Sequence, residues 1–275
     1  MCRHLGYVGP PVRVGDMLTL GPHSLRTQAW APRDMRRGGT INADGFGVAW
    51  WRAEDDAVTV SRYRNPAPIW TDPAVEEVLP HLESWAVLGA VRSATVGMPV
   101  ERSACAPFIR GRWAFSHNGV VPDWRAALTA VAAEFAGAAA ELDADGLFAP
   151  ARLLEAESAT DSAALWVLLG ALLATDVPDG DWAAAPAALR LLLSAVLTHA
   201  PDSRLNLLLG DGAQLWATAW YHSLSALVTD DFAILSSEPF DDDPRWQAIP
   251  DRSLVTARPG HLAVEPLPDP ERPAQ

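Results

Sequence analysis

Short apolar segments recur along the chain between turns rich in glycine, proline and aspartate. Segments of this kind that are enriched in Val, Leu, Ile and Trp are typical of β-strands. We therefore predict strands over His4–Val8, Phe46–Arg52, Val58–Tyr63, Ala86–Arg92, Trp113–Ser116, Arg204–Leu209, Leu215–Trp220, Leu224–Val228, Phe232–Ser236, Ser253–Ala257 and His261–Val264.

A turn of glycine and aspartate, residues 210–212, separates Leu205–Leu209 from Gln214–Trp220. Both residue types tolerate the positive φ that tight turns require. These two segments are therefore predicted to form a β-hairpin.

Longer segments rich in alanine and leucine lie between the strand groups and predict helices, and an aspartate can cap the N-terminus of each. The predicted helices are Trp124–Ala136 with Asp123, Ser162–Ala174 with Asp161, and Trp182–His199 with Asp181. Strands, then helices, then a strand-rich final third predict an α+β protein in which antiparallel sheets are covered by helices.

No linker rich in proline or serine divides the chain, so residues 1–265 are expected to form a single domain. The proline-rich residues 266–275 are expected to be a disordered tail. Residues 24–45 and 137–151 show no regular pattern and are expected to be irregular.

Composition narrows the classes of function. Among 275 residues, 34 are acidic and 21 basic, which gives a formal net charge of −13. This charge repels a phosphate backbone, so no nucleic-acid partner is expected. Every basic residue is arginine, which excludes chemistry that requires a lysine.

The sequence also limits where the protein acts. The longest apolar run, Ala163–Ala174, is shorter than the roughly 20 residues that cross a bilayer, so no membrane partner is expected. Two cysteines are too few for a disulfide framework, and no apolar leader follows a charged start. We therefore expect a cytoplasmic protein.

Cysteine at position 2 is the most informative single residue. A small second residue permits removal of Met1, and the processed chain then begins with Cys2. The thiol of such a residue is a nucleophile, and its α-amine, with an ordinary pKa of about 7.7–8.0, is a general base on the same residue. A cysteine can also stand at position 2 by accident, so this inference depends on the rest of the chain.

Three polar clusters adjoin predicted strands, where loops present side chains to a shared cleft. They are Asn42–Trp50, Arg92–Gly97 and Ser116–Gly119, the last of which ends a predicted strand. Taken singly, Asn-x-Asp-Gly and His-Asn-Gly are ordinary turns, and an arginine after a strand commonly faces solvent.

Together, and in this order after Met-Cys, the clusters resemble the class II glutamine amidotransferases, which are N-terminal-nucleophile hydrolases. The resemblance covers residues 2–161 and continues through Ser-Ser-Glu-Pro at residues 236–239. It implies a four-layer αββα sandwich of two antiparallel sheets between helix layers. It also implies that Cys2 is the catalytic nucleophile.

The resemblance assigns roles to further residues. It implies that the Asn118 side chain and the Gly119 backbone N–H form the oxyanion hole. Arg92 is then the residue that holds the glutamyl α-carboxylate, and Asp161 the one that binds the α-ammonium. Asp161 has a competing interpretation as a helix cap, and a carboxylate has one oxygen for each role.

Two positions depart from the family pattern. Members linked to synthases have Trp after the arginine and His after the threonine of the Arg motif, where this chain has Ser93 and Val96. Because the side chain of Val96 cannot donate a hydrogen bond, binding of the glutamyl group is expected to depend more on Arg92 and Thr95.

The segments Met1–Tyr7, Ala31–Thr40 and Arg92–Val100 are similar to those of the ergothioneine-biosynthesis amidohydrolases. This resemblance implies a small-molecule partner, γ-glutamyl-hercynylcysteine S-oxide, which is hydrolysed to hercynylcysteine S-oxide and glutamate. The leaving amine carries a trimethylammonium group, which aromatic faces bind by cation–π attraction. Trp30 is the candidate residue to line the binding site for this group, although most tryptophans are expected in the core.

Two alternatives stay open: a glutaminase subunit that supplies ammonia to a separate synthetase, and a non-catalytic, partner-binding relic. The presence of Cys2, Arg92 and Asn118 counts against the relic. The spacing of His and Cys matches no metal site, so neither a metal nor another cofactor is expected. Cys105 is expected to be a small buried or substrate-loop residue rather than a second nucleophile, and a homo-oligomer is left open.

Overall fold

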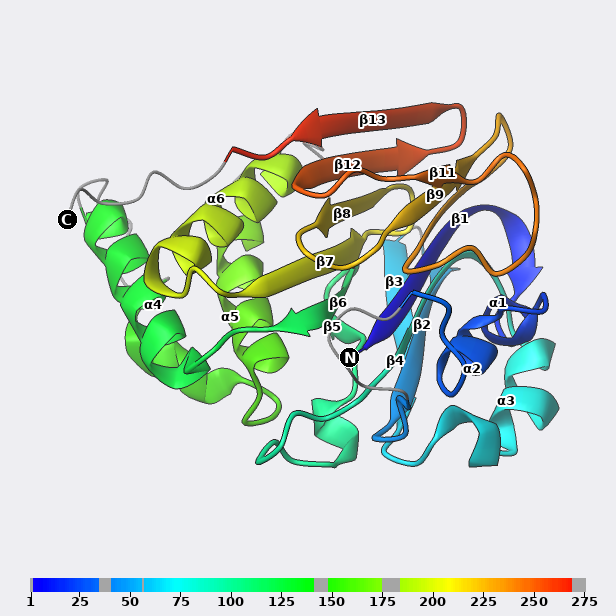
Figure 1. Cartoon of the computed structure of the whole chain (residues 1–275), viewed down its shortest axis with the longest axis horizontal. Helices are drawn as coiled ribbons and strands as arrows, with labels where there is room; N and C mark the ends of the chain where they lie inside the picture. Colours follow the sequence, from blue (N-terminus) through cyan, green and yellow to red (C-terminus); the bar gives the residue numbers. More distant parts are fainter. Residues whose placement is uncertain (1, 35–40, 56, 141–147, 175–183, 269–275) are drawn as a thin grey trace.

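The computed structural model describes residues 2–34, 41–55, 57–140, 148–174 and 184–268. In this part of the chain two antiparallel sheets lie face to face (Figure 1). The first sheet has seven strands in the order β11-β9-β10-β1-β4-β2-β3, and the second has six in the order β13-β12-β8-β7-β6-β5.

Each strand is bounded as follows. The first sheet contains β1 (Arg3–Arg13), β2 (Phe46–Glu54), β3 (Ala57–Asn65), β4 (Glu83–Val91), β9 (Ser225–Val228), β10 (Ala233–Ser236) and β11 (Gln247–Ala248). The second contains β5 (Phe108–Arg110), β6 (Trp113–Val120), β7 (Arg204–Gly210), β8 (Leu215–Ala219), β12 (Ser253–Arg258) and β13 (His261–Pro266).

Helices cover the outer face of each sheet, which gives four layers (Figure 1). The first sheet is covered by α1 (Asp16–Thr19), α2 (Leu25–Gln28) and α3 (Ala74–Glu77), and the second by α4 (Trp124–Ala140), α5 (Asp161–Ala174) and α6 (Ala184–His199). Short 3-10 helices lie in the connections: Ile69–Thr71, Leu79–His81, Arg102–Ala104 and Pro150–Glu155. The predicted α+β class and its αββα layers are confirmed.

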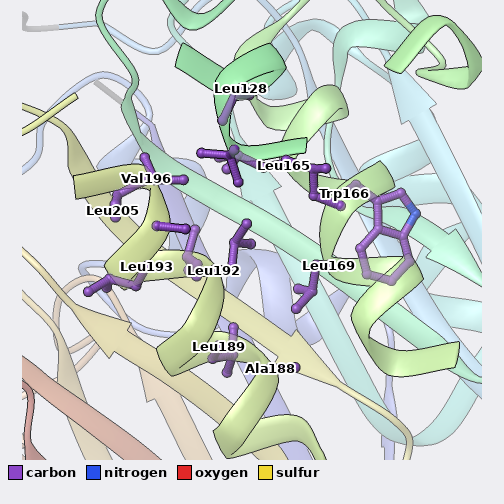
Figure 2. Packing of buried hydrophobic residues seen from close by; sticks show 14 of the residues in the cluster. Leu128, Leu165, Trp166, Leu169, Ala188, Leu189, Leu192, Leu193, Val196 and Leu205 are labelled. Carbon is purple, nitrogen blue, oxygen red and sulfur yellow. The ribbon is translucent and has the colours of Figure 1, made fainter. Parts of the chain in front are cut away.

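Apolar side chains fill each of the three spaces between layers. Figure 2 shows Leu165 and Leu169 of α5 and Leu192 of α6 gathered with Leu205 of β7. A second cluster lies between the sheets, and a third lies between the first sheet and its short helices. Burial of apolar area on both faces of each sheet therefore fixes the order of the layers.

Alternation along β1 decides which of its side chains enter the space between the sheets. Leu5 and Tyr7 belong to the cluster under the short helices, whereas Val8 belongs to the cluster between the sheets. Since successive strand residues point to opposite faces, His4 and Gly6 share the face of Val8. A Cβ on Gly6 would indeed contact leucines of the second sheet.

The same rule orients β6. Ala114 lies in the cluster between the sheets, and Phe115 packs against the helices. Ser116 and Asn118 therefore point toward the first sheet, and His117 points toward α5. The two sheets thus place polar residues of β1 and β6 opposite one another inside the protein.

All the strands predicted from the sequence are present, and the predicted hairpin is confirmed by the pairing of Leu209 with Trp216. Two further strands, β5 and β11, are too short to leave an apolar pattern. The prediction that a strand ends at Ser116 is wrong, because β6 continues to Val120. The His-Asn-Gly sequence therefore lies inside a strand and not in a turn.

The predicted helices differ mainly at their ends. Asp161 is the first residue of α5, and the hydroxyl of Thr160 accepts the N–H of Ala163 at 3.2 Å. Thr160 is therefore the capping residue at this end, and the prediction that Asp161 caps from outside the helix is wrong. Helix α4 starts after Asp123 as predicted, and its extension to Ala140 overlaps the predicted irregular segment. The predicted cap Asp181 lies outside the described residues.

The ends of the irregular segments also need correction. Residues 24–45 contain α2, and residues 35–40 lie outside the described part of the chain. The predicted tail begins too early: Pro266 ends β13, and Leu267 is buried, with its N–H donated to the carbonyl of Arg252 at 2.7 Å. Residues 269–275 lie outside the described residues. Among the described helices, none has the length and apolar character needed to cross a membrane.

Two indole groups of the first sheet bind turns of the second. The Nε1–H of Trp51 donates to the carbonyl of Arg112 at 2.7 Å, and that of Trp85 donates to the carbonyl of Gly212 at 2.8 Å. Trp51 is fully buried, whereas Trp85 is partly exposed. These bonds fix how the two sheets are positioned against each other.

Trp51→Phe should therefore lower the free energy of unfolding by about 1–3 kcal/mol, because the Arg112 carbonyl loses this donor and the smaller ring leaves a void. Urea unfolding should show a lower midpoint with an unchanged slope. Trp85→Phe is the control, and its effect should be smaller. An equal loss in both variants would contradict the role assigned to burial at Trp51.

Candidate active site

The candidate site forms where β1 and β6 approach each other across the two sheets. His4 Nδ1 lies 3.3 Å from Ser116 Oγ, which joins the two strands. Cys2 directly precedes β1 and is half-buried, with its Sγ 3.9 Å from the carbonyl oxygen of Ser93. Asn118 lies on the same face of β6 as Ser116. The predicted nucleophile thus directly precedes one of the two strands that meet here, and the predicted oxyanion donor lies on the other.

Asn118 is the most unusual polar residue of the site. Its side chain is 1% exposed, and neither its Oδ1 nor its Nδ2 has a hydrogen-bond partner among the described residues. Its neighbour in register on β7, Asn206, is as deeply buried but accepts from the N–H groups of Trp220 and His222. A buried amide without partners is costly, so the chain leaves the Asn118 amide to be satisfied by a group such as water or a ligand.

Gly119 allows the strand pairing that orients Asn118. It pairs with Leu205, and a Cβ at this position would overlap the carbonyl oxygen of Arg204 and press on the ring of His117. Any larger residue would push β6 away from β7. The Gly119 position therefore requires glycine for packing, whatever its backbone N–H does in catalysis.

His117 fixes the other face of the same strand. Its Nε2 lies 2.9 Å from the carbonyl oxygen of Arg204, which can only accept, so Nε2 carries the proton. Its Nδ1 lies within hydrogen-bond distance of the hydroxyl of Ser162 in α5, at 3.1 Å. The ring thereby locks β6 to β7 and α5, and keeps the neighbouring Asn118 turned toward β1.

Arg92 lies directly after β4 and is held by its backbone. Its N–H donates to the carbonyl of Gly45 at 2.8 Å, and its carbonyl accepts from the N–H of Asp44 at 2.9 Å. Its guanidinium is half-buried and reaches only the Asp44 carbonyl, at 3.4 Å; within the described residues it forms no ion pair. Among the described residues no carboxylate therefore forms an ion pair with Arg92, although its charge helps to lower the pKa of Glu101. Thr95 and Val96, in the loop that follows Arg92, are exposed.

Both carboxylate oxygens of Asp161 accept hydrogen bonds from backbone N–H groups. Oδ1 accepts the N–H of Ser162 at 2.8 Å, and Oδ2 accepts the N–H of Val121, just beyond β6, at 2.9 Å. It therefore ties the start of α5 to the end of β6, which is a structural role that the sequence did not predict. Its role as a ligand of an ammonium group stays a prediction, since each carboxylate oxygen can accept a second hydrogen bond.

The two remaining sequence candidates differ in exposure. Cys105 is buried under Gly45, and burial raises the pKa of its thiol to about 11. A thiol with that pKa is protonated near neutrality and is a poor nucleophile, in line with the role predicted for Cys105. Trp30 is 56% exposed beside Arg33 and Asp34, and the rest of that loop, residues 35–40, lies outside the described residues.

The sequence missed several residues that surround the nucleophile. Arg3 and Glu238 form a buried ion pair with Nε and Oε1 2.9 Å apart, and Asp44 Oδ2 accepts the N–H of Ala94 at 2.7 Å. His4 was also missed, although it lies on the predicted strand that follows Cys2 directly. Among the described residues, no cluster of His, Cys, Asp or Glu is arranged to hold a metal ion.

Two buried histidines near the site are held neutral. Burial, with the nearby His117 and Arg3, lowers the pKa of His4 to about 3. Burial, with Arg204 and Arg3, lowers the pKa of His222 to about 3. His4 Nε2 and His222 Nδ1 have no partner within the described residues. These two buried side chains are therefore polar but carry no charge near neutral pH.

Comparison with known proteins agrees with this geometry. Residues 24–230 match the family described as glutamine amidotransferases class-II. The γ-glutamyl-hercynylcysteine sulfoxide hydrolase of Mycolicibacterium smegmatis is 38% identical over 267 residues, which are 97% of this chain and 100% of the relative. The protein of the same name from Mycobacterium tuberculosis is 40% identical over 255 residues, 93% of this chain and 92% of the relative.

Solved structures with a similar fold include a class-II glutamine aminotransferase domain protein from Silicibacter pomeroyi, with a TM-score of 0.59 and 22% identity over 97% of this chain and 99% of the other. Glutamine phosphoribosylpyrophosphate amidotransferase from B. subtilis matches with a TM-score of 0.58 and 13% identity, over 97% of this chain and 49% of the other. At these identities the two structures support the fold alone.

The neutral histidines predict how stability depends on pH. Between about pH 6 and pH 4 an unfolded histidine binds a proton that folded His4 does not, so stability falls as the pH is lowered, by about 1.4 kcal/mol per pH unit for each such group. In His4→Gln the free energy of unfolding, measured with urea at a series of pH values, should depend on pH less steeply, by the contribution of one histidine. His261→Gln, on the exposed face of β13, is the control. An unchanged slope in His4→Gln would show that His4 is not held neutral.

Proposed function

The chain belongs to the class-II glutamine amidotransferases, and we propose that it removes glutamate from γ-glutamyl-hercynylcysteine S-oxide through a Cys2 thioester. The observation that carries the proposed chemistry is the buried, unpartnered amide of Asn118 on the strand facing Cys2. The substrate rests on the two relatives of that name, which are about two-fifths identical over nearly their whole length. The products are glutamate and hercynylcysteine S-oxide.

In the first half-reaction the Cys2 thiol attacks the γ-carbonyl carbon. After removal of Met1 the α-amine of Cys2 is free, takes the thiol proton and then passes it to the leaving nitrogen. The carbonyl oxygen becomes an oxyanion that accepts from the Asn118 side chain and the Gly119 N–H. When the C–N bond breaks, the free amine departs and the γ-glutamyl group remains on sulfur as a thioester.

In the second half-reaction water attacks the same carbonyl carbon. The α-amine takes a proton from the water, the C–S bond breaks, and the proton returns to the sulfur. Glutamate leaves and the thiol is regenerated. Each oxyanion donor is expected to contribute about 3–4 kcal/mol to these barriers, because it is fixed before the charge develops.

The glutamyl end carries two charges that orient it. Arg92 is proposed to bind the α-carboxylate in a bidentate pair, since it forms no ion pair among the described residues. Thr95 is close in sequence and exposed, and adds a hydroxyl donor. Asp161 is proposed to bind the α-ammonium with the remaining lone pairs of its oxygens. These contacts position the γ-carbonyl for attack.

The leaving end carries a trimethylammonium group, and Trp30 is proposed to bind it through its exposed ring. The proposal places the reaction in the cytoplasm, because both cysteines are free and a thiol nucleophile requires a reducing compartment. It involves a small-molecule substrate with no cofactor, no nucleic acid and no membrane, and it leaves a homo-oligomer open.

The proposed substrate is tested by offering the purified protein free glutamine and γ-glutamyl-hercynylcysteine S-oxide side by side. Glutamate release should be much faster from the S-oxide, with kcat/KM higher by at least about a hundredfold, because only that substrate contacts the leaving-amine side. Equal or faster hydrolysis of glutamine would contradict the proposal and favour a glutaminase subunit.

Asn118→Leu should separate catalysis from stability. The variant is expected to lose about 10²–10³ in kcat with KM little changed, because one oxyanion donor is gone. Its melting temperature should stay at or above that of the wild type, since the amide it removes has no partner. Asn206→Leu is the matched control: it leaves buried N–H groups unpaired, at about 1–3 kcal/mol each. A raised KM with unchanged kcat in Asn118→Leu would place the oxyanion hole elsewhere.

A further inference from the structure

An ion pair buried beside the nucleophile is not used by the proposed reaction. The side chains of Arg3 and Glu238 are only 1% and 4% exposed. A buried ion pair is rarely worth more to stability than a well-packed apolar pair, because both charges lose their hydration. Its presence next to Cys2 therefore calls for an explanation other than stability.

The pair joins the nucleophile to a distant segment of the chain. Arg3 Nη1 donates to the carbonyl of Cys2 at 3.0 Å, and Nη2 donates to the carbonyl of Asp34. Glu238 Oε2 accepts the N–H of Arg33 at 2.7 Å. One guanidinium thus holds the backbones of Cys2 and Asp34 side by side, and the carboxylate holds the preceding residue of the same segment.

Glu238 is itself firmly placed. Its carbonyl accepts from the hydroxyl of Ser236 at 2.6 Å and from Gln28 Nε2 at 3.4 Å. Next to it, Ser237 exchanges two hydrogen bonds with the backbone of His4, at 2.9 Å and 3.0 Å. The carboxylate is therefore a rigid anchor and not a mobile surface charge.

Cys2 lies between two segments with different neighbours. Its Sγ is nearest the Ser93 carbonyl, at the start of the segment proposed to hold the glutamyl group. Its carbonyl, on the Arg3 side, is joined to Arg33–Asp34. An amide attacked by the thiol has a glutamyl end and an amine end. If the glutamyl end lies along the segment that follows Arg92, the amine end lies on the other side, toward Arg33–Asp34.

We propose that Arg3 and Glu238 are positioning residues that hold Arg33–Asp34 beside the nucleophile and so determine which leaving amines the site accepts. This inference rests on the proposed function for the place of the glutamyl end. It assigns the pair no contact with the reacting atoms. Loosening the pair should therefore harm substrates with a large leaving amine and spare those that release only ammonia.

The test compares amides that form the same thioester. Glutamine releases ammonia, γ-glutamyl-p-nitroanilide releases a large aromatic amine, and the hercynylcysteine S-oxide conjugate is a second large substrate. Because kcat/KM reports the steps up to release of the amine, later hydrolysis of the shared thioester cancels. The variants are Glu238→Gln and Arg3→Met, with Arg3→Met/Glu238→Leu so that no charge is left buried alone.

A second ion pair supplies matched controls. Arg112 and Asp211 are 3.1 Å apart, and Asp211 is 2% exposed, at turns of the second sheet. Asp211→Asn and Arg112→Met alter an ion pair whose carboxylate is as deeply buried as that of Glu238, although Arg112 is 37% exposed. Circular dichroism and melting temperature establish that each variant is folded at the assay temperature.

In Glu238→Gln the ratio of kcat/KM for the anilide to that for glutamine should fall at least about tenfold below the wild-type ratio, since small misplacements near a reacting centre have effects of this size. The controls should keep the wild-type ratio. A wild-type ratio in folded Glu238→Gln and in the double variant would overturn the inference, as would an equal loss for both amides. Failure of the wild type to hydrolyse the S-oxide would instead overturn the proposed function, and the anilide ratio would still decide this inference.

Discussion

The close approach of β1 and β6 across the two sheets is the constraint on which the site depends. Each strand sends every second residue into the shared space, so His4 meets Ser116, and Asn118 follows on the same face. A slip of one residue in either strand would turn this whole set toward the helices. Pairing on both edges prevents it, because β1 is held by β4 and β10, and β6 by β5 and β7.

The neighbouring strands β6 and β7 differ in how the chain satisfies their buried polar side chains. Asn118 and Asn206 stand opposite each other on β6 and β7, equally buried, yet only Asn206 has its hydrogen bonds completed by the chain. His4 Nε2 is likewise unpaired among the described residues. Folded proteins satisfy most buried polar groups, so a local group of exceptions indicates binding or catalysis. Asn118 and His4 lie on the two strands that meet across the sheets, and the other such atoms of the described residues belong to Gln28, Ser203 and His222.

The strands and the hairpin could be predicted because their apolar pattern is local, and the ordered motifs after Met-Cys indicated the family. The strand was predicted to end at Ser116, because the turn propensity of His-Asn-Gly hides its pairing with β7, which Gly119 permits. The contact of Arg3 with Glu238 spans 235 positions, and no local pattern encodes it. Asp161 was predicted as a cap, but its second oxygen binds Val121, a partner 40 residues away.

Positioning and binding fall on different charged residues around Cys2. Arg3, Glu238 and Asp161 have their charged atoms engaged by backbone groups or by each other, so moving any of them would displace the chain. Among the described residues the Arg92 guanidinium reaches one backbone carbonyl, which is why we propose that its charge binds the substrate carboxylate. The guanidinium of Arg3 thus positions the backbone beside Cys2, whereas that of Arg92 is proposed to bind substrate.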